Sequence, residues 1–122
     1  MATSKIQKPI KTETFTPTIP DTIEFGAITF KKFGNVVCIG INNVVKAEAG
    51  SNIICTLPVA WRPSQTLSAI IVRPSSPTPD NAVSLRIYVR ANGVVELYNY
   101  RDTAITASTN SSGTLTFVVD DI

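Results

Sequence analysis

The stretch that decides the fold is Thr29-Phe-Lys-Lys-Phe-Gly-Asn-Val-Val-Cys-Ile-Gly40, which is followed by Thr56-Leu-Pro-Val-Ala-Trp-Arg-Pro-Ser64. In the first stretch, Gly34-Asn35 separates two apolar runs. This pattern is typical of two strands joined by a tight turn, because Gly and Asn adopt turn conformations at little cost. In the second stretch Pro58 and Pro63 bracket the only Trp, so we expect a corner there, since Pro cannot donate a backbone hydrogen bond to a sheet.

Length and composition indicate one all-β domain. The 122 residues are 43% hydrophobic, which suits a single folded domain with a modest core. Thr, Ser, Asn, Val and Ile are abundant, and no segment repeats its apolar residues at a helical spacing, so we expect little or no helix. The predicted fold is an antiparallel β-sandwich of jelly-roll or Greek-key type.

Several function classes are not expected. A net charge of +2 is too small to indicate nucleic-acid binding, and the longest apolar runs are too short for membrane insertion. The first twenty residues lack the apolar core of a secretory signal, so we expect the chain to be made in the cytoplasm. The sequence has no His and shows no metal-ligand cluster, phosphate-binding loop or nucleophile motif, so we expect no cofactor, no metal and no enzymatic activity.

The two cysteines, Cys38 and Cys55, both lie in apolar runs. A disulfide between neighbouring strands would require an oxidising compartment. Without a secretory signal, we favour two free thiols that act as small apolar side chains.

Residues 1–20 differ from the remainder, residues 21–122, which form the predicted β-sandwich domain. Lysines alternate with Thr and Pro in residues 1–20, which predicts an extended N-terminal arm or linker. A Pro- and Ser-rich loop is expected at 74–81. Strands are expected at residues 23–32, 36–45, 52–57, 67–73, 83–91, 94–100 and 114–119.

The hairpin around Asn92-Gly93 allows a prediction of register. A two-residue turn would mix polar and apolar residues on both faces. A three-residue loop with Gly93 in a left-handed conformation pairs Val89 with Val95 and Ile87 with Leu97 on one face. The other face then carries six residues, which we call the tyrosine–arginine face: Arg86, Tyr88, Arg90, Glu96, Tyr98 and, beyond the strand, Tyr100.

From about Gly26 to Val119, the chain resembles the C-terminal β-sandwich, or head, domain of phage tail-fibre and baseplate receptor-binding proteins. The resemblance rests on the order of the Gly34-Asn35 turn, the Leu57-Pro58-x-x-Trp61-Arg62-Pro63 corner, the Asn92-Gly93-Val94-Val95-Glu96-Leu97 hairpin and the Thr114-Leu-Thr-Phe-Val-Val119 strand. It implies a virion component that forms a homotrimer, contacts other phage tail or baseplate proteins and binds host cell-wall saccharide. Receptor contacts vary within this family, so no contact residue carries over by motif.

The tyrosine–arginine face is the candidate saccharide-binding surface, because sugars stack on tyrosine rings and their hydroxyls bond to Arg and Glu. Two other interpretations require the same residue types: a solvated sheet face held by cross-strand pairs, and a subunit interface. For Trp61 we favour packing inside the corner over a saccharide platform. Arg62 is expected to bind a loop carbonyl or carboxylate. The alternative function is a structural tail subunit that caps or joins tail components through its N-terminal arm.

Overall fold

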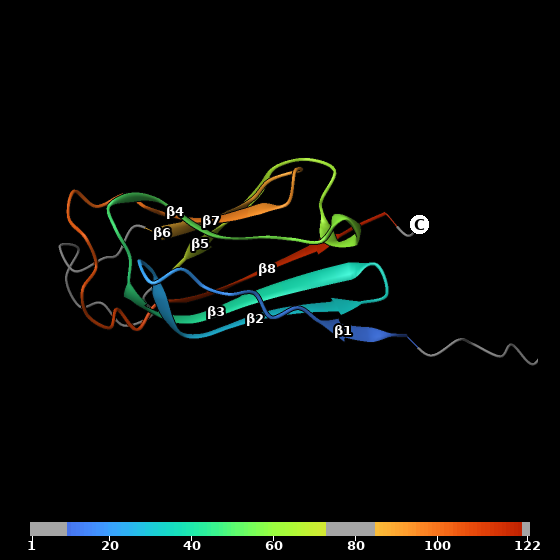
Figure 1. Cartoon of the computed structure of the whole chain (residues 1–122), viewed down its shortest axis with the longest axis horizontal. Coiled ribbons are helices and arrows are strands. Elements are labelled where there is room, and N and C mark those ends of the chain that lie inside the picture. Colours follow the sequence, from blue (N-terminus) through green and yellow to red (C-terminus); the bar gives the residue numbers. More distant parts are fainter. Residues whose placement is uncertain (1–9, 73–84, 121–122) are drawn as a thin grey trace, which may run out of the picture.

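The computed structural model describes residues 10–72 and 85–120, and in these residues two four-stranded antiparallel sheets pack face to face (Figure 1). The first sheet has the order β1 (Thr12–Thr14), β2 (Glu24–Phe33), β3 (Val36–Lys46) and β8 (Ser112–Val118). The second sheet has the order β4 (Gly50–Thr56), β7 (Val94–Asn99), β6 (Leu85–Val89) and β5 (Leu67–Ile71). The only helical segment in the described residues is the short 3₁₀ turn η1 (Val59–Trp61). The predicted all-β antiparallel sandwich is confirmed.

The second sheet is a Greek key. Strands β5, β6 and β7 are neighbours in both sequence and sheet, whereas β4, which precedes β5, lies beside β7. Residues 57–66 therefore run from one edge of this sheet to the other. This is the segment with the Pro58 and Pro63 corner, which packs at one end of the sandwich (Figure 1).

The core follows from strict alternation along the central strands. In β3, Val37, Ile39 and Ile41 point between the sheets and are buried, and Phe30 of β2 is buried beside them. From the second sheet, β6 and β7 contribute the buried side chains of Leu85, Ile87, Val89, Val95 and Leu97. A period of two residues is therefore the physical reason that each strand has one inward apolar face.

The expected turn and strands coincide closely with those observed. Gly34 adopts φ 61°, the conformation that the tight turn between β2 and β3 requires. The expected loop at 74–81, residue 73 of one expected strand, residues 83–84 of another and residues 1–9 of the expected arm lie outside the described residues.

The described part of the expected arm lies against the sandwich. Strand β1 pairs with the end of β2, Thr12 opposite Phe33 and Thr14 opposite Lys31. The next residue, Phe15, donates its backbone N–H to the Phe30 carbonyl at 3.0 Å and packs its ring edge-on against the Phe30 ring. Strand β1 was not predicted, because its three residues are too few to display an alternating pattern.

Candidate functional site

The register of the β6–β7 hairpin places the candidate residues on one face. Val89 pairs with Val95 and Ile87 with Leu97, and Gly93 has φ 92°. The Arg90 N–H donates to the Val94 carbonyl at 2.9 Å, which closes a three-residue loop. The predicted register is thus confirmed. The candidate side chains of both strands lie on the sheet face that points away from the core.

Glu96 is the centre of a hydrogen-bonded cluster on this face. Its Oε1 accepts hydrogen bonds from Arg90 Nη2 at 2.6 Å and from Arg90 Nε at 3.1 Å. Its Oε2 accepts a hydrogen bond from the hydroxyl of Ser51 on β4. Both carboxylate oxygens are therefore used within the chain, and Glu96 is 7% exposed.

The charge of Glu96 is stabilised by these partners. Burial raises the pKa of the Glu96 carboxyl, but the hydrogen bonds from Ser51 and Arg90 and the positive charge of Arg90 outweigh burial and lower the pKa below its usual range. Glu96 is thus a carboxylate at neutral pH, paired with Arg90.

The tyrosines form the other half of the cluster, and all three tyrosines of the chain belong to it. The Arg90 guanidinium lies 5.6 Å from the centroid of the Tyr88 ring, a cation–π arrangement. The hydroxyls of Tyr88 and Tyr100 are hydrogen-bonded to each other. The rings of Tyr98 and Tyr100 lie 4.4 Å apart between centroids and are inclined by 42°.

Tyr100 is the most accessible ring, with 51% of the residue exposed, although it lies just beyond the end of β7. The buried Asn99 holds the backbone there: its Oδ1 accepts from the Arg101 N–H at 3.0 Å, and its Nδ2 donates to the Thr103 carbonyl at 3.2 Å. The hydrogen bond to Tyr88, together with partial burial, raises the pKa of the Tyr100 hydroxyl, so this hydroxyl is neutral at physiological pH.

Arg86 is the one residue of the tyrosine–arginine face whose charge is not paired within the described part of the chain. Its Nη1 donates to the Ser68 hydroxyl on β5 at 3.1 Å, which is a bond to a neutral group. Arg86 pairs with Tyr98 across β6 and β7, next to the Tyr98–Tyr100 ring pair. The Tyr98–Tyr100 ring pair, half-buried at Tyr98 and exposed at Tyr100, therefore lies next to a guanidinium with no charged partner among the described residues.

Sequence reasoning missed the residues that flank this face. Ser51 and Ile53 lie on β4, and Ser68 and Ile70 lie on β5; both isoleucines are exposed. Ile53 pairs with Glu96 and Ile70 pairs with Arg86. No local signal identifies them, because the partners of β6 and β7 depend on the order of strands in the sheet.

The residues of the corner between Pro58 and Pro63 stabilise the fold by packing and hydrogen bonding. Trp61 is buried, and its ring lies 5.9 Å from that of Phe15. Arg62 Nε donates to the Leu57 carbonyl at 3.0 Å. Both observations confirm the interpretations favoured from the sequence.

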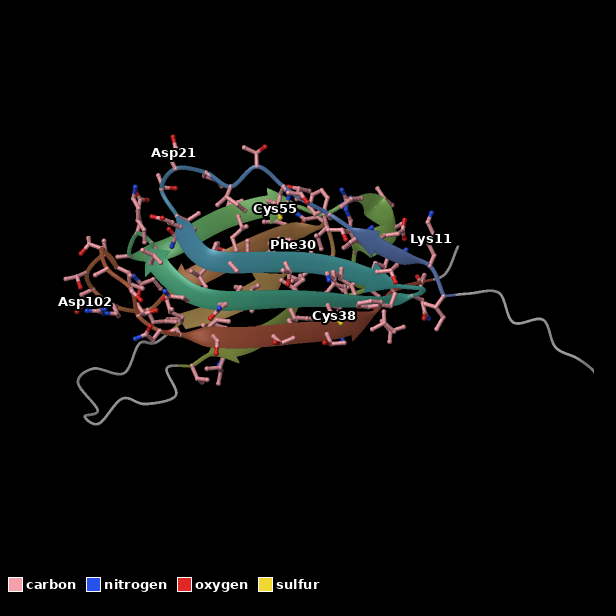
Figure 2. All side chains as sticks on the ribbon, turned by 90° about the horizontal axis from the view of Figure 1, so that it is seen from below. Lys11, Asp21, Phe30, Cys38, Cys55 and Asp102 are labelled. Carbon is pink, nitrogen blue, oxygen red and sulfur yellow. The ribbon has the colours of Figure 1, made fainter. Side chains whose placement is uncertain are left out.

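Both cysteines are free, and they lie on different sheets, Cys38 in β3 and Cys55 in β4 (Figure 2). Burial raises the pKa of the Cys55 thiol to about 12. The thiol interpretation therefore describes this structure, in which Cys38 and Cys55 are not bonded to each other.

We expect Cys55 to resist alkylation in the folded protein. With a pKa of about 12, roughly one thiol in ten thousand is ionised at pH 8, and the thiolate is the reactive form. Labelling with iodoacetamide at pH 8, followed by peptide mass spectrometry, should find Cys55 largely unmodified in buffer and fully modified in urea. Equal labelling rates in both conditions would show that the thiol is not protected.

Two hollows lie away from the tyrosine–arginine face. One, of about 260 Å³, is on the outer side of the first sheet and is lined by uncharged residues that include Thr29, Gly40 and Thr114. The other, of about 290 Å³, lies between residues 14–19 and β2. Residues 10–72 and 85–120 contain no group of three or more His, Cys, Asp or Glu that could hold a metal ion. They also contain no helix that is long and apolar enough to cross a membrane.

No family model matches the chain, and no curated protein matches it significantly. Among solved structures, the chain is similar to the crystal structure of the head domain of phage bIL170, which is described among the receptor-binding domains of lactococcal phages. The TM-score is 0.61 at 12% sequence identity, and the match covers 89% of this chain and 99% of that chain. The resemblance inferred from the sequence is thus confirmed at the level of the fold: the chain has the fold of a phage receptor-binding head domain.

Proposed function

We propose that this chain is the receptor-binding head of a phage tail, and that its tyrosine–arginine face binds saccharide on the host cell surface without enzymatic activity. The observation that carries the proposal is the Tyr98–Tyr100 ring pair, of which Tyr100 is exposed, beside Arg86, which has no charged partner within the described residues, on a domain with the fold of a phage receptor-binding head. The protein would then be a component of the virion tail, in contact with other tail or baseplate proteins.

The chemistry of this surface suits a sugar. The apolar C–H face of a pyranose stacks on a tyrosine ring, and the Tyr100 hydroxyl and the Arg86 guanidinium supply polar contacts that orient it. A saccharide that carries phosphate or carboxylate would gain charge-assisted hydrogen bonds from Arg86. In this proposal Glu96 supports the surface more than it contacts the sugar, because it is 7% exposed and its carboxylate is bonded to Ser51 and Arg90.

We propose that the head works as a homotrimer. A single shallow site on a sheet face binds one saccharide unit weakly, but three linked copies that engage a repetitive polymer increase the overall avidity without any new contact. Association of copies would also cover strand edges that otherwise invite aggregation.

Tyr98→Ala and Tyr100→Ala are expected to weaken binding by about tenfold or more each, because each removes one ring of the tilted pair. Fluorescently labelled chain is titrated onto a panel of bacterial strains and onto cell-wall polysaccharides isolated from them, while light scattering records the oligomeric state. Val118→Thr, at an exposed position on the outer side of the first sheet, is the control and should bind like the unmodified chain.

The alternative function, a structural tail subunit, is favoured by one observation: Ile53 and Ile70 flank the same face and are exposed. Aromatic and apolar residues together with Arg are also enriched in protein interfaces. In that case Tyr98→Ala would disrupt assembly, and the unmodified chain would bind no strain in the panel. Retained assembly together with lost saccharide binding would instead support the receptor-binding head.

A further inference from the structure

We infer that Ser51, Glu96 and Arg90 are positioning residues, which hold Tyr88 and through it the Tyr98–Tyr100 pair in the geometry that receives the saccharide. This inference rests on the proposed function and divides the tyrosine–arginine face into residues that contact the ligand and residues that support them. The contacts are Tyr98, Tyr100 and Arg86.

The first step is that the Glu96 carboxylate is held in one position. Glu96 is held from two sides at once, by Ser51 of β4 and by Arg90 just after the end of β6, so its side chain cannot rotate without breaking hydrogen bonds on both sides. Arg90 donates two of its N–H groups to one carboxylate oxygen, and this fixes the plane of the guanidinium. Glu96 itself is buried, whereas 45% of the Arg90 side chain is exposed, so the carboxylate is the sheltered end of this pair.

The second step is that the fixed Arg90 guanidinium holds the Tyr88 ring. Arg90 stacks over the face of Tyr88, and the Tyr88 hydroxyl bonds to the Tyr100 hydroxyl. Tyr88 is therefore held at its ring by Arg90 and holds Tyr100 at its hydroxyl. A continuous chain of contacts leads from Ser51 to the Tyr98–Tyr100 ring pair.

The third step is that the Tyr100 side chain needs such support. Tyr100 follows the last residue of β7 and so lies outside the paired part of the strand, and half of the residue is exposed. An exposed tyrosine that is free to change rotamer must be immobilised when a ligand binds, which lowers affinity. The bond to Tyr88 restrains Tyr100 in the unbound protein, and this preorganisation strengthens binding.

The sharpest test is Ser51→Ala, which removes one hydroxyl outside the ring pair, compared with Ser51→Thr, which keeps a hydroxyl at the same place. Because all three tyrosines of the chain belong to the cluster, ring-¹³C tyrosine labelling gives NMR signals from the site alone. We expect Ser51→Ala to shift the ring signals of Tyr88 and Tyr100 and to raise the Kd about three- to tenfold for the polysaccharide that the unmodified chain binds best. Ser51→Thr should restore both.

A pH profile separates positioning from general structural support. The charged or titratable groups that face Glu96 are Tyr88 of β6, Arg90 just after β6 and Tyr98 of β7; on β4, burial raises the pKa of Cys55, which is therefore neutral. Because the pKa of Glu96 is lowered, the unmodified chain should keep its affinity as the pH falls through the usual carboxyl range and lose it only below that range. Ser51→Ala removes a hydrogen bond that lowers this pKa, so its loss of affinity should begin at a higher pH. Glu96→Gln has no carboxyl group at this position, so its affinity should not fall in this acid range because of residue 96.

Three outcomes would decide against the inference or separate it from the proposed function. Unchanged tyrosine signals and unchanged affinity in Ser51→Ala would overturn it. Lost affinity with unchanged tyrosine signals would also overturn it, since Ser51 would then contact the saccharide directly. If the unmodified chain binds no saccharide, the proposed function fails, and the tyrosine signals of Ser51→Ala still decide whether this network orders the rings.

Discussion

Trp61→Ala should lower the free energy of unfolding by about 3–5 kcal/mol, the range for removing a large buried aromatic side chain. Trp61 is 5% exposed. It contacts Phe15, which in turn packs edge-on against Phe30 of the core. Its removal would leave a cavity where the corner, the segment after β1 and the sandwich meet. Urea denaturation followed by circular dichroism measures the loss without relying on the fluorescence of the removed Trp.

Val59→Ala is the matched control, because Val59 belongs to the same 3₁₀ turn but is 72% exposed. This substitution should change stability by no more than about 0.5 kcal/mol, as is usual for surface positions. A loss in Trp61→Ala close to that of Val59→Ala would show that the corner does not depend on the buried ring.

Gly93→Ala is the second substitution with a large expected effect, a loss of about 2–4 kcal/mol, since it combines backbone strain with overpacking. Gly93 has φ 92°, a conformation that L-residues rarely adopt. A Cβ there would lie 2.9 Å from the Leu57 carbonyl oxygen and 2.5 Å from Arg62 Nε. The backbone oxygen cannot move away easily, because the Gly93 carbonyl itself accepts the Leu57 N–H at 2.8 Å.

Gly50→Ala separates the two contributions. Gly50 has a similar φ of 84°, but a Cβ there would meet no atom within 4 Å. Its substitution should therefore cost only the backbone strain, about 1–2 kcal/mol. The difference between the two variants in urea denaturation measures the steric part. Equal losses would mean that the hairpin loop and the corner can move apart without cost.

Much of this site is predictable because hairpin geometry is local. Once Gly93 is assigned a left-handed conformation, the pairing of Val89 with Val95 follows, and the pairing places Arg86, Tyr88, Glu96 and Tyr98 on the outer face. The turn at Gly34-Asn35 is equally local. The packing of Trp61 follows from its position between two prolines.

The hydrogen-bond partners of the side chains on that face could not be predicted in this way. The sequence suggested that Glu96 contacts a sugar hydroxyl, whereas the structure places its carboxylate between Ser51 and Arg90. Ser51 lies 45 residues before Glu96 along the chain. Their proximity depends on β4 lying beside β7, and the alternation within either strand contains no information about that neighbour.

By itself, then, the sequence determined the all-β class, most strand positions, the hairpin register and the membership of the tyrosine–arginine face, because these depend on a two-residue period and on turn residues close in sequence. Only the tertiary structure decided that β1 and Phe15 pack on the sandwich, that Ser51 holds Glu96, and that Tyr100 reaches the Tyr88 hydroxyl. These contacts join segments brought together by the order of strands in the two sheets, which is selected by burial of the whole core.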